Sequence, residues 1–206
     1  MIRFQIEQLR YKRYCGGVEP PGFVHHMRPG SVAKLMAAIG CIKGARVWEL
    51  GCGQGYLVWH LLAQGASHVI AVDREQTILD SIPISAYERH TGTSEFKLIQ
   101  FPETEHQWIA KQVSIITMFI GSPYLVEKLV DLFMANENVN TIAFMTPSRG
   151  FADLRAKILR WCNETDCSLS TITIKLSVSG EQRQTMILKR KSSISSSSSN
   201  SSSSMQ

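Results

Sequence analysis

Long hydrophobic runs are missing from this chain of 206 residues. A helix that crosses a bilayer needs about 20 consecutive apolar residues, and no run of that length occurs. Residues 1–5 also lack the apolar stretch that a signal peptide carries. These absences argue against a membrane or secreted protein, and we expect an intracellular protein, in the nucleus or the cytoplasm.

Paired cysteines are missing too. The chain has five cysteines, an odd number, and no cluster of His and Cys has the spacing of a zinc site. We therefore expect reduced thiols and no bound metal. The net charge is only +5, which favours acidic partners such as nucleic acid or nucleosomes weakly.

The chain divides into three parts. Residues 1–28 form an arm in which residues 10–14 interleave basic and aromatic side chains, typical either of a substrate-facing segment or of a solvated cap on the domain. Residues 29–191 have the composition of one folded domain. Residues 192–206 are nearly all serine and cannot bury a core, so we expect them to be disordered.

Apolar periodicity within the domain alternates between strands and helices. A helix is predicted from Pro29 with Ser31 as its N-cap. The chain ends in a β-hairpin, which puts the last strand antiparallel between two others. We therefore predict an α/β fold with three layers and a Rossmann-like sheet of seven strands, mostly parallel with the last one reversed. The predicted strands are residues 46–50, 68–72, 96–101, 113–120, 140–145, 171–178 and 184–189; further helices are predicted at 57–64, 77–90, 125–134 and 151–161.

The loop after the first strand is the most informative stretch. Gly51, Gly53 and Gly55 stand at alternate positions, with Cys52 as a small filler. Glycine lets the backbone approach a ligand closely and adopt positive φ. Glu49 ends the first strand, and Asp73 follows the second, where an acid can accept hydrogen bonds from both ribose hydroxyls. The pattern predicts a nucleoside-binding crevice.

The spacing separates this loop from that of dinucleotide-binding folds, in which the third glycine comes one residue later. The Glu49-x-Gly51-x-Gly53-x-Gly55 run resembles motif I of the class I S-adenosylmethionine-dependent methyltransferases. The resemblance covers roughly residues 29–190. It implies that S-adenosyl-L-methionine is the cofactor, that the glycine loop and Glu49 lie beside its methionine part, and that Asp73 binds its ribose. Arg74, beside Asp73, and Glu103, after the third strand, complete the predicted cofactor set.

The segment after the fourth strand, Gly121-Ser122-Pro123-Tyr124, is where such enzymes meet their acceptor. Methyltransferases that act on adenine carry there a polar residue, two prolines and an aromatic residue. This chain keeps one proline and the aromatic residue, which can stack on a flipped base. Ribose 2′-O-methyltransferases need an aspartate on the fourth strand, where this chain has Thr117 and Met118, and that class is set aside.

The chain also has a weaker resemblance to lysine methyltransferases that lack a SET domain, the disruptor-of-telomeric-silencing family. That resemblance implies a narrow lysine channel formed by Phe119, Ser122 and Tyr124, although the paired asparagines of the family are absent. We expect a methyltransferase with a macromolecular substrate, a lysine of a protein, such as a histone, as the leading hypothesis. The alternatives are N-methylation of a base amine, such as adenine, in RNA or DNA, and a non-catalytic methyltransferase-like binding subunit.

Overall fold

A computed structural model describes residues 27–82, 87, 92–98, 113–119, 123–145, 151–176 and 182–191. Ser122, Glu103, the basic-aromatic arm and the serine-rich tail lie outside these residues. Within the described part, the search for a helix that is long and apolar enough to cross a membrane finds none.

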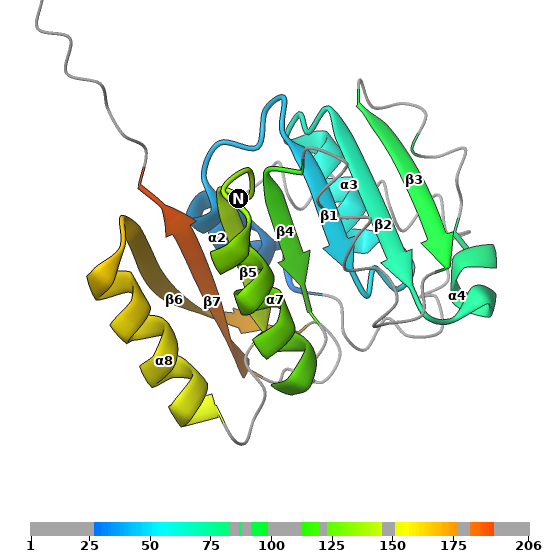
Figure 1. Cartoon of the computed structure of the whole chain (residues 1–206). Helices are drawn as coiled ribbons and strands as arrows, with labels where there is room; N and C mark the ends of the chain where they lie inside the picture. The colour runs from blue at the N-terminus through cyan, green and yellow to red at the C-terminus, as the bar shows by residue number, and fades with distance from the viewer. Residues whose placement is uncertain are drawn as a thin grey trace, which may run out of the picture.

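The chain folds around one seven-stranded sheet in the order β3-β2-β1-β4-β5-β7-β6 (Figure 1). The five strands from β3 to β5 pair in parallel, whereas β7 runs antiparallel to both of its neighbours. The predicted sheet with one reversed strand is confirmed. Its strands are β1 (Arg46–Leu50), β2 (His68–Asp73), β3 (Thr93–Leu98), β4 (Ile115–Met118), β5 (Thr141–Met145), β6 (Cys167–Lys175) and β7 (Gln182–Arg190).

Helices cover both faces of the sheet, which explains why the central strands β1, β4 and β5 are buried along nearly their whole length. One hydrophobic cluster joins α2 and α3 to one face, and a second joins α7 and α8 to the other. Successive residues of β1 divide between them, since Val47 belongs to the first cluster and Trp48 to the second. The described helices are α2 (Pro29–Ile39), α3 (Tyr56–Ala63), α4 (Gln76–Asp80), α7 (Pro123–Ala135) and α8 (Phe151–Glu164).

The start of α2 differs from the prediction. Arg28 is the N-cap and Pro29 the first helical residue, so Ser31 does not cap the helix. Proline suits this position because its missing N–H would have no partner there. The Ser31 hydroxyl instead accepts a hydrogen bond of 2.7 Å from the backbone N–H of Lys175, which ties α2 to the end of β6.

Several predicted boundaries are also wrong by a few residues. The third strand begins at Thr93 rather than residue 96, and β6 begins at Cys167 rather than residue 171. Both strands lie at the outer edges of the sheet, where only one neighbouring strand pairs with them. β3 opens on the polar residues Thr93, Ser94 and Glu95, so the hydrophobic pattern does not show its start. β6 opens with Cys167 and Leu169 alternating with serine, a strand pattern that the prediction did not include. The helix predicted at 77–90, with an interruption or restart at Pro83, corresponds to α4, which ends at Asp80, and to the helical residue Tyr87.

Candidate nucleoside-binding site

The glycine loop between β1 and α3 adopts a backbone that needs glycine. Gly51, Gly53 and Gly55 have φ values of 70°, 51° and 79°, in the left-handed region that other residues rarely adopt. The backbone N–H groups of Gly51 and Cys52 both donate to the carbonyl of Val72 at 2.9 Å. The loop is thereby attached to the end of β2, the strand that carries Asp73.

Asp73 connects the two halves of the site. Its Oδ2 accepts a hydrogen bond of 2.9 Å from the N–H of Gly53, and its Oδ1 accepts one of 3.2 Å from the N–H of Glu75. The carboxylate therefore lies where the glycine loop and the end of β2 meet, as predicted for a ribose-binding acid. Each carboxylate oxygen can accept a further bond, since an ionised carboxylate offers about four lone-pair sites.

Gly53 leaves open space beside Asp73. A Cβ built on Gly53 would meet no atom within 4 Å, so neighbouring packing does not account for the missing side chain. Its positive φ and this open space together describe a backbone that a ligand can approach closely. A nucleoside with its ribose on Asp73 and its remaining part over the glycine loop fits this arrangement.

Two tyrosines, neither of which the sequence assigned a role at the site, hold the loop in place. Tyr87 is buried, and its hydroxyl donates to the carbonyl of Gly55 at 2.9 Å. The hydroxyl of Tyr56, in the first turn of α3, donates to the carbonyl of Met27 at 3.1 Å. Burial raises the pKa of Tyr56, so this phenol stays a donor. A single sequence offers little signal for these roles, because buried tyrosines occur throughout protein cores.

Glu49 lies deeper than its predicted role suggests. Its residue is 2% exposed, and its carboxylate accepts a hydrogen bond from the hydroxyl of Thr117 on the neighbouring strand β4. Burial raises the pKa of Glu49 well above its ordinary value, because the ionised form loses its hydration. Contact between Glu49 and the methionine part of a cofactor stays a prediction, and in this structure the carboxyl group is buried against Thr117.

The other predicted cofactor residues are placed as follows. Cys52 is buried within the loop, and burial, together with the negative charges of Asp73 and Glu49, raises the pKa of its thiol. It therefore acts as a small neutral filler, as predicted, and not as a nucleophile. Arg74 has a side chain 83% exposed and forms a surface ion pair of 3.6 Å with Glu75.

Of the predicted acceptor residues, the structure describes Phe119 and Tyr124. Phe119 packs against the cluster formed by α2 and α3. Tyr124 is 56% exposed in the first turn of α7, which covers the opposite face, and Lys128 Nζ lies 5.9 Å from the centre of its ring. The lysine channel that was to include both side chains stays a prediction, with Ser122 outside the described residues.

Comparison with curated sequences gives short matches. No family model matches the chain. A stretch of 38 residues is 50% identical to the tRNA U34 carboxymethyltransferase of Alteromonas mediterranea, covering 18% of this chain and 11% of that protein. A stretch of 59 residues is 37% identical to the protein of the same name from Methylococcus capsulatus, covering 29% of this chain and 18% of that protein. The matched stretches thus span a small part of the length of these relatives.

Comparison with solved structures covers most of the chain. A dimethyladenosine transferase from Plasmodium falciparum matches with a TM-score of 0.59 and 19% identity over 80% of this chain and 62% of that chain. A ribosomal protein L11 methylase from Lactobacillus delbrueckii subsp. bulgaricus matches with a TM-score of 0.53 and 16% identity over 83% of each chain.

A third structure holds the expected cofactor. It is a candidate tRNA (m1A22) methyltransferase from Streptococcus pneumoniae in complex with S-adenosyl-L-methionine, with a TM-score of 0.51 and 15% identity over 77% of this chain and 72% of that chain. Identities this low show a shared fold and nothing about the acceptor. Together with the sheet order, the comparisons show that this chain has the Rossmann-like methyltransferase fold.

Proposed function

We propose that this chain is an S-adenosylmethionine-dependent methyltransferase that acts on a base of RNA. The observation that carries the cofactor part is the hydrogen bond between the Asp73 carboxylate and the Gly53 N–H, beside open space over the glycine loop. The fold and the cofactor-bound neighbour support it.

The residues of the chain bind and orient the cofactor. S-adenosylmethionine supplies an already activated methyl group, so positioning and exclusion of water are the main tasks left to the protein. Asp73 accepts the ribose hydroxyls, while Gly51, Gly53 and Gly55 let the backbone approach the rest of the molecule. Tyr87 and the carbonyl of Val72 keep the loop in this conformation before the ligand arrives.

The RNA part of the proposal replaces protein lysine as the leading hypothesis. The curated relatives are named for tRNA, and one structural neighbour is named for tRNA as well. No comparison supports a histone or nucleosome substrate, and the lysine channel rests only on the weaker sequence resemblance. The L11 methylase among the neighbours shows that this fold also serves protein acceptors, so the acceptor must be tested directly.

Tyr124 is our candidate for contact with the acceptor base. An exposed aromatic ring at the start of α7 offers a surface on which a base extruded from its stack can lie. Stacking on an aromatic side chain contributes about 1–3 kcal/mol per base, and it does not require the phenol hydroxyl. Tyr124→Phe should therefore keep the KM of the wild type for RNA, whereas Tyr124→Ala should raise it.

The experiment supplies radiolabelled S-adenosylmethionine with separate pools of tRNA, ribosomal RNA, DNA, histones and nucleosomes. We expect label in an RNA pool, with Tyr124→Ala raising the KM for RNA about tenfold and Tyr124→Phe close to wild type. Leu159→Ala is the matched control, because Leu159 is an exposed large hydrophobic residue on α8.

Label in protein alone would reject the RNA proposal in favour of the lysine hypothesis. If the chain binds S-adenosylhomocysteine but no pool becomes labelled, a non-catalytic binding subunit would be favoured. Equal effects of Tyr124→Ala and Leu159→Ala would remove Tyr124 from the acceptor site while leaving the RNA assignment intact.

A further inference from the structure

Two cations lie opposite each other where the start of α2 meets the end of β6. Met27 forms an antiparallel bridge with Leu176, and the N–H of Arg28 donates to the carbonyl of Lys175 at 2.9 Å. The N–H of Lys175 in turn donates to the Ser31 hydroxyl. Backbone hydrogen bonds therefore fix the two charged residues side by side, independently of what their side chains contact.

This pairing of like charges has no local compensation in the described part of the chain. Arg28 and Lys175 are both exposed, and the ion pairs formed between described residues involve neither of them. Like charges opposite each other on antiparallel strands destabilise the pairing. Lys157 shows the usual alternative, because it bonds to Asp131 at 3.1 Å and lies 3.7 Å from Glu127. An anion bound between Arg28 and Lys175 would relieve this repulsion.

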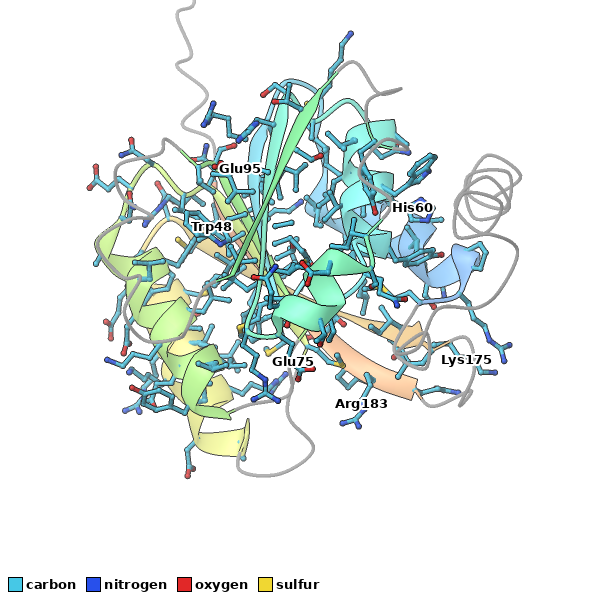
Figure 2. The ribbon with its side chains drawn as sticks, turned by 90° about the vertical axis from the view of Figure 1, so that its right-hand side faces the viewer. Trp48, His60, Glu75, Glu95, Lys175 and Arg183 are labelled. Atoms are coloured by element: carbon cyan, nitrogen blue, oxygen red, sulfur yellow. The ribbon has the colours of Figure 1, made fainter. Side chains whose placement is uncertain are left out.

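The two cations lie at the same end of the parallel strands, the carboxyl end, as the glycine loop and Asp73; we call this end of the strands the carboxyl edge. β6 runs parallel to β1 and β2 across the sheet, so the carboxyl ends of all three strands share one edge. Arg183, near the start of the reversed β7, is paired with Ile174 rather than with Lys175, so its side chain lies on the other face of the sheet. Figure 2 shows Lys175 and Arg183 at the lower edge of the molecule, where Glu75 also lies, just beyond the end of β2.

The separation along the carboxyl edge suits a nucleic-acid strand. Neighbouring strands lie about 4.8 Å apart, so β7 and β6 are about 14 and 19 Å from β1 along the edge. A few nucleotides of a single strand span that distance. Glu49, Asp73 and Glu75 lie at the carboxyl ends of β1 and β2, away from β6. Asp153 lies in the first turn of α8, the helix that follows β5.

We propose that Arg28 and Lys175 bind backbone phosphates of the RNA substrate a few nucleotides from the base that enters the crevice. This inference rests on the proposed function, since it assigns the surface that holds the RNA. Phosphate contacts of this kind set the position of the nucleic acid and carry no base specificity.

The test compares Arg28→Gln, Lys175→Gln and the double variant with Lys43→Gln as matched control. Lys43 is exposed in the turn before β1, at the opposite edge of the sheet, so its substitution removes the same charge elsewhere. RNA affinity is measured by fluorescence anisotropy over a series of salt concentrations, and methylation kinetics and binding of S-adenosylhomocysteine are measured alongside.

Each phosphate contact on a single strand contributes about 0.7 to the slope of log K against log salt. We therefore expect the double variant to lose about 1.4 units of slope, to raise the KM for RNA, and to keep the wild-type kcat and cofactor affinity. Lys43→Gln should resemble the wild type in every measurement.

A double variant with the salt slope and KM of Lys43→Gln would overturn the phosphate surface while leaving the methyltransferase proposal standing. A wild-type chain that binds S-adenosylhomocysteine but neither binds nor methylates RNA would overturn both RNA proposals. Loss of activity on an acidic protein, with RNA affinity unchanged, would assign the cations to a protein substrate instead.

Discussion

Replacing Glu49 with glutamine should make the stability of this fold less sensitive to pH. The carboxyl of Glu49 is 2% exposed and has the Thr117 hydroxyl as its side-chain partner. Burial raises its pKa well above the ordinary value of a glutamate. Glutamine has nearly the same shape and keeps an acceptor for Thr117, so the substitution chiefly removes the ionisation.

The direction of this pH effect on stability follows from the number of protons that Glu49 binds in the folded and in the unfolded chain. Below the ordinary pKa of glutamate, about 4.3, the side chain is protonated in both the folded and the unfolded chain. Above it the unfolded chain releases the proton, whereas the folded chain keeps it until the pH reaches the raised pKa. Within that window unfolding releases a proton, so the free energy of unfolding of the wild type falls relative to Glu49→Gln as pH rises, by up to about 1.4 kcal/mol per pH unit.

Urea unfolding of both proteins at intervals between pH 5 and pH 7.5 measures this difference. The range keeps the ordinary cysteine thiols protonated, so their titration contributes little. We expect the gap between the two unfolding free energies to widen in favour of Glu49→Gln as pH rises, with equal m-values. Parallel pH profiles would refute the reasoning, because they would show that Glu49 titrates alike in the folded and unfolded chains.

Two further substitutions test the packing of the fold before β3 and the support of the glycine loop. Gly92→Ala should destabilise the fold by about 1–3 kcal/mol in urea unfolding, since the new Cβ would overlap the carbonyl oxygen of Ala66. The control is Gly30→Ala in α2, where the new Cβ has no atom within 4 Å and the change should be neutral or slightly stabilising. Equal effects of the two substitutions on the free energy of unfolding would count against this packing. Tyr87→Phe should lower the free energy of unfolding by about 1 kcal/mol and weaken cofactor binding, because the loop loses its hydrogen bond at Gly55. Unchanged affinity for the cofactor in calorimetry would show that the loop holds its conformation without this hydroxyl.

The fold was predictable because its signals are local and agree with one another. The apolar central strands, the glycine loop and the closing hairpin each favour the same architecture, and β1 begins and ends at the predicted residues. The edge strand β3 was placed too late because its first residues are polar, and β6 was placed too late although Cys167 and Leu169 alternate with serine at its start. The start of α2 was misjudged because Ser31 suits a cap equally well, and only the tertiary structure brings its hydroxyl to Lys175.

The site was predictable where backbone conformation dictates residue type. Positive φ requires glycine at Gly51, Gly53 and Gly55, and the position of Asp73 follows from the βα connection. The burial of Glu49 against Thr117 depends on β4, which lies far along the chain but next to β1 in the sheet. Tyr87 reaches the loop from a similarly distant position, and such contacts leave no local pattern in one sequence.

Calorimetric titration of the whole chain with S-adenosylhomocysteine tests the central claim most directly, because it measures the crevice without any assumption about the acceptor. We expect binding to the wild type that Asp73→Ala and Gly53→Arg each remove, the first by deleting the ribose acceptor and the second by filling the space over the loop. Gly30→Ala should bind as the wild type does. Absence of binding heat from the folded wild type over a range of temperatures would contradict the account.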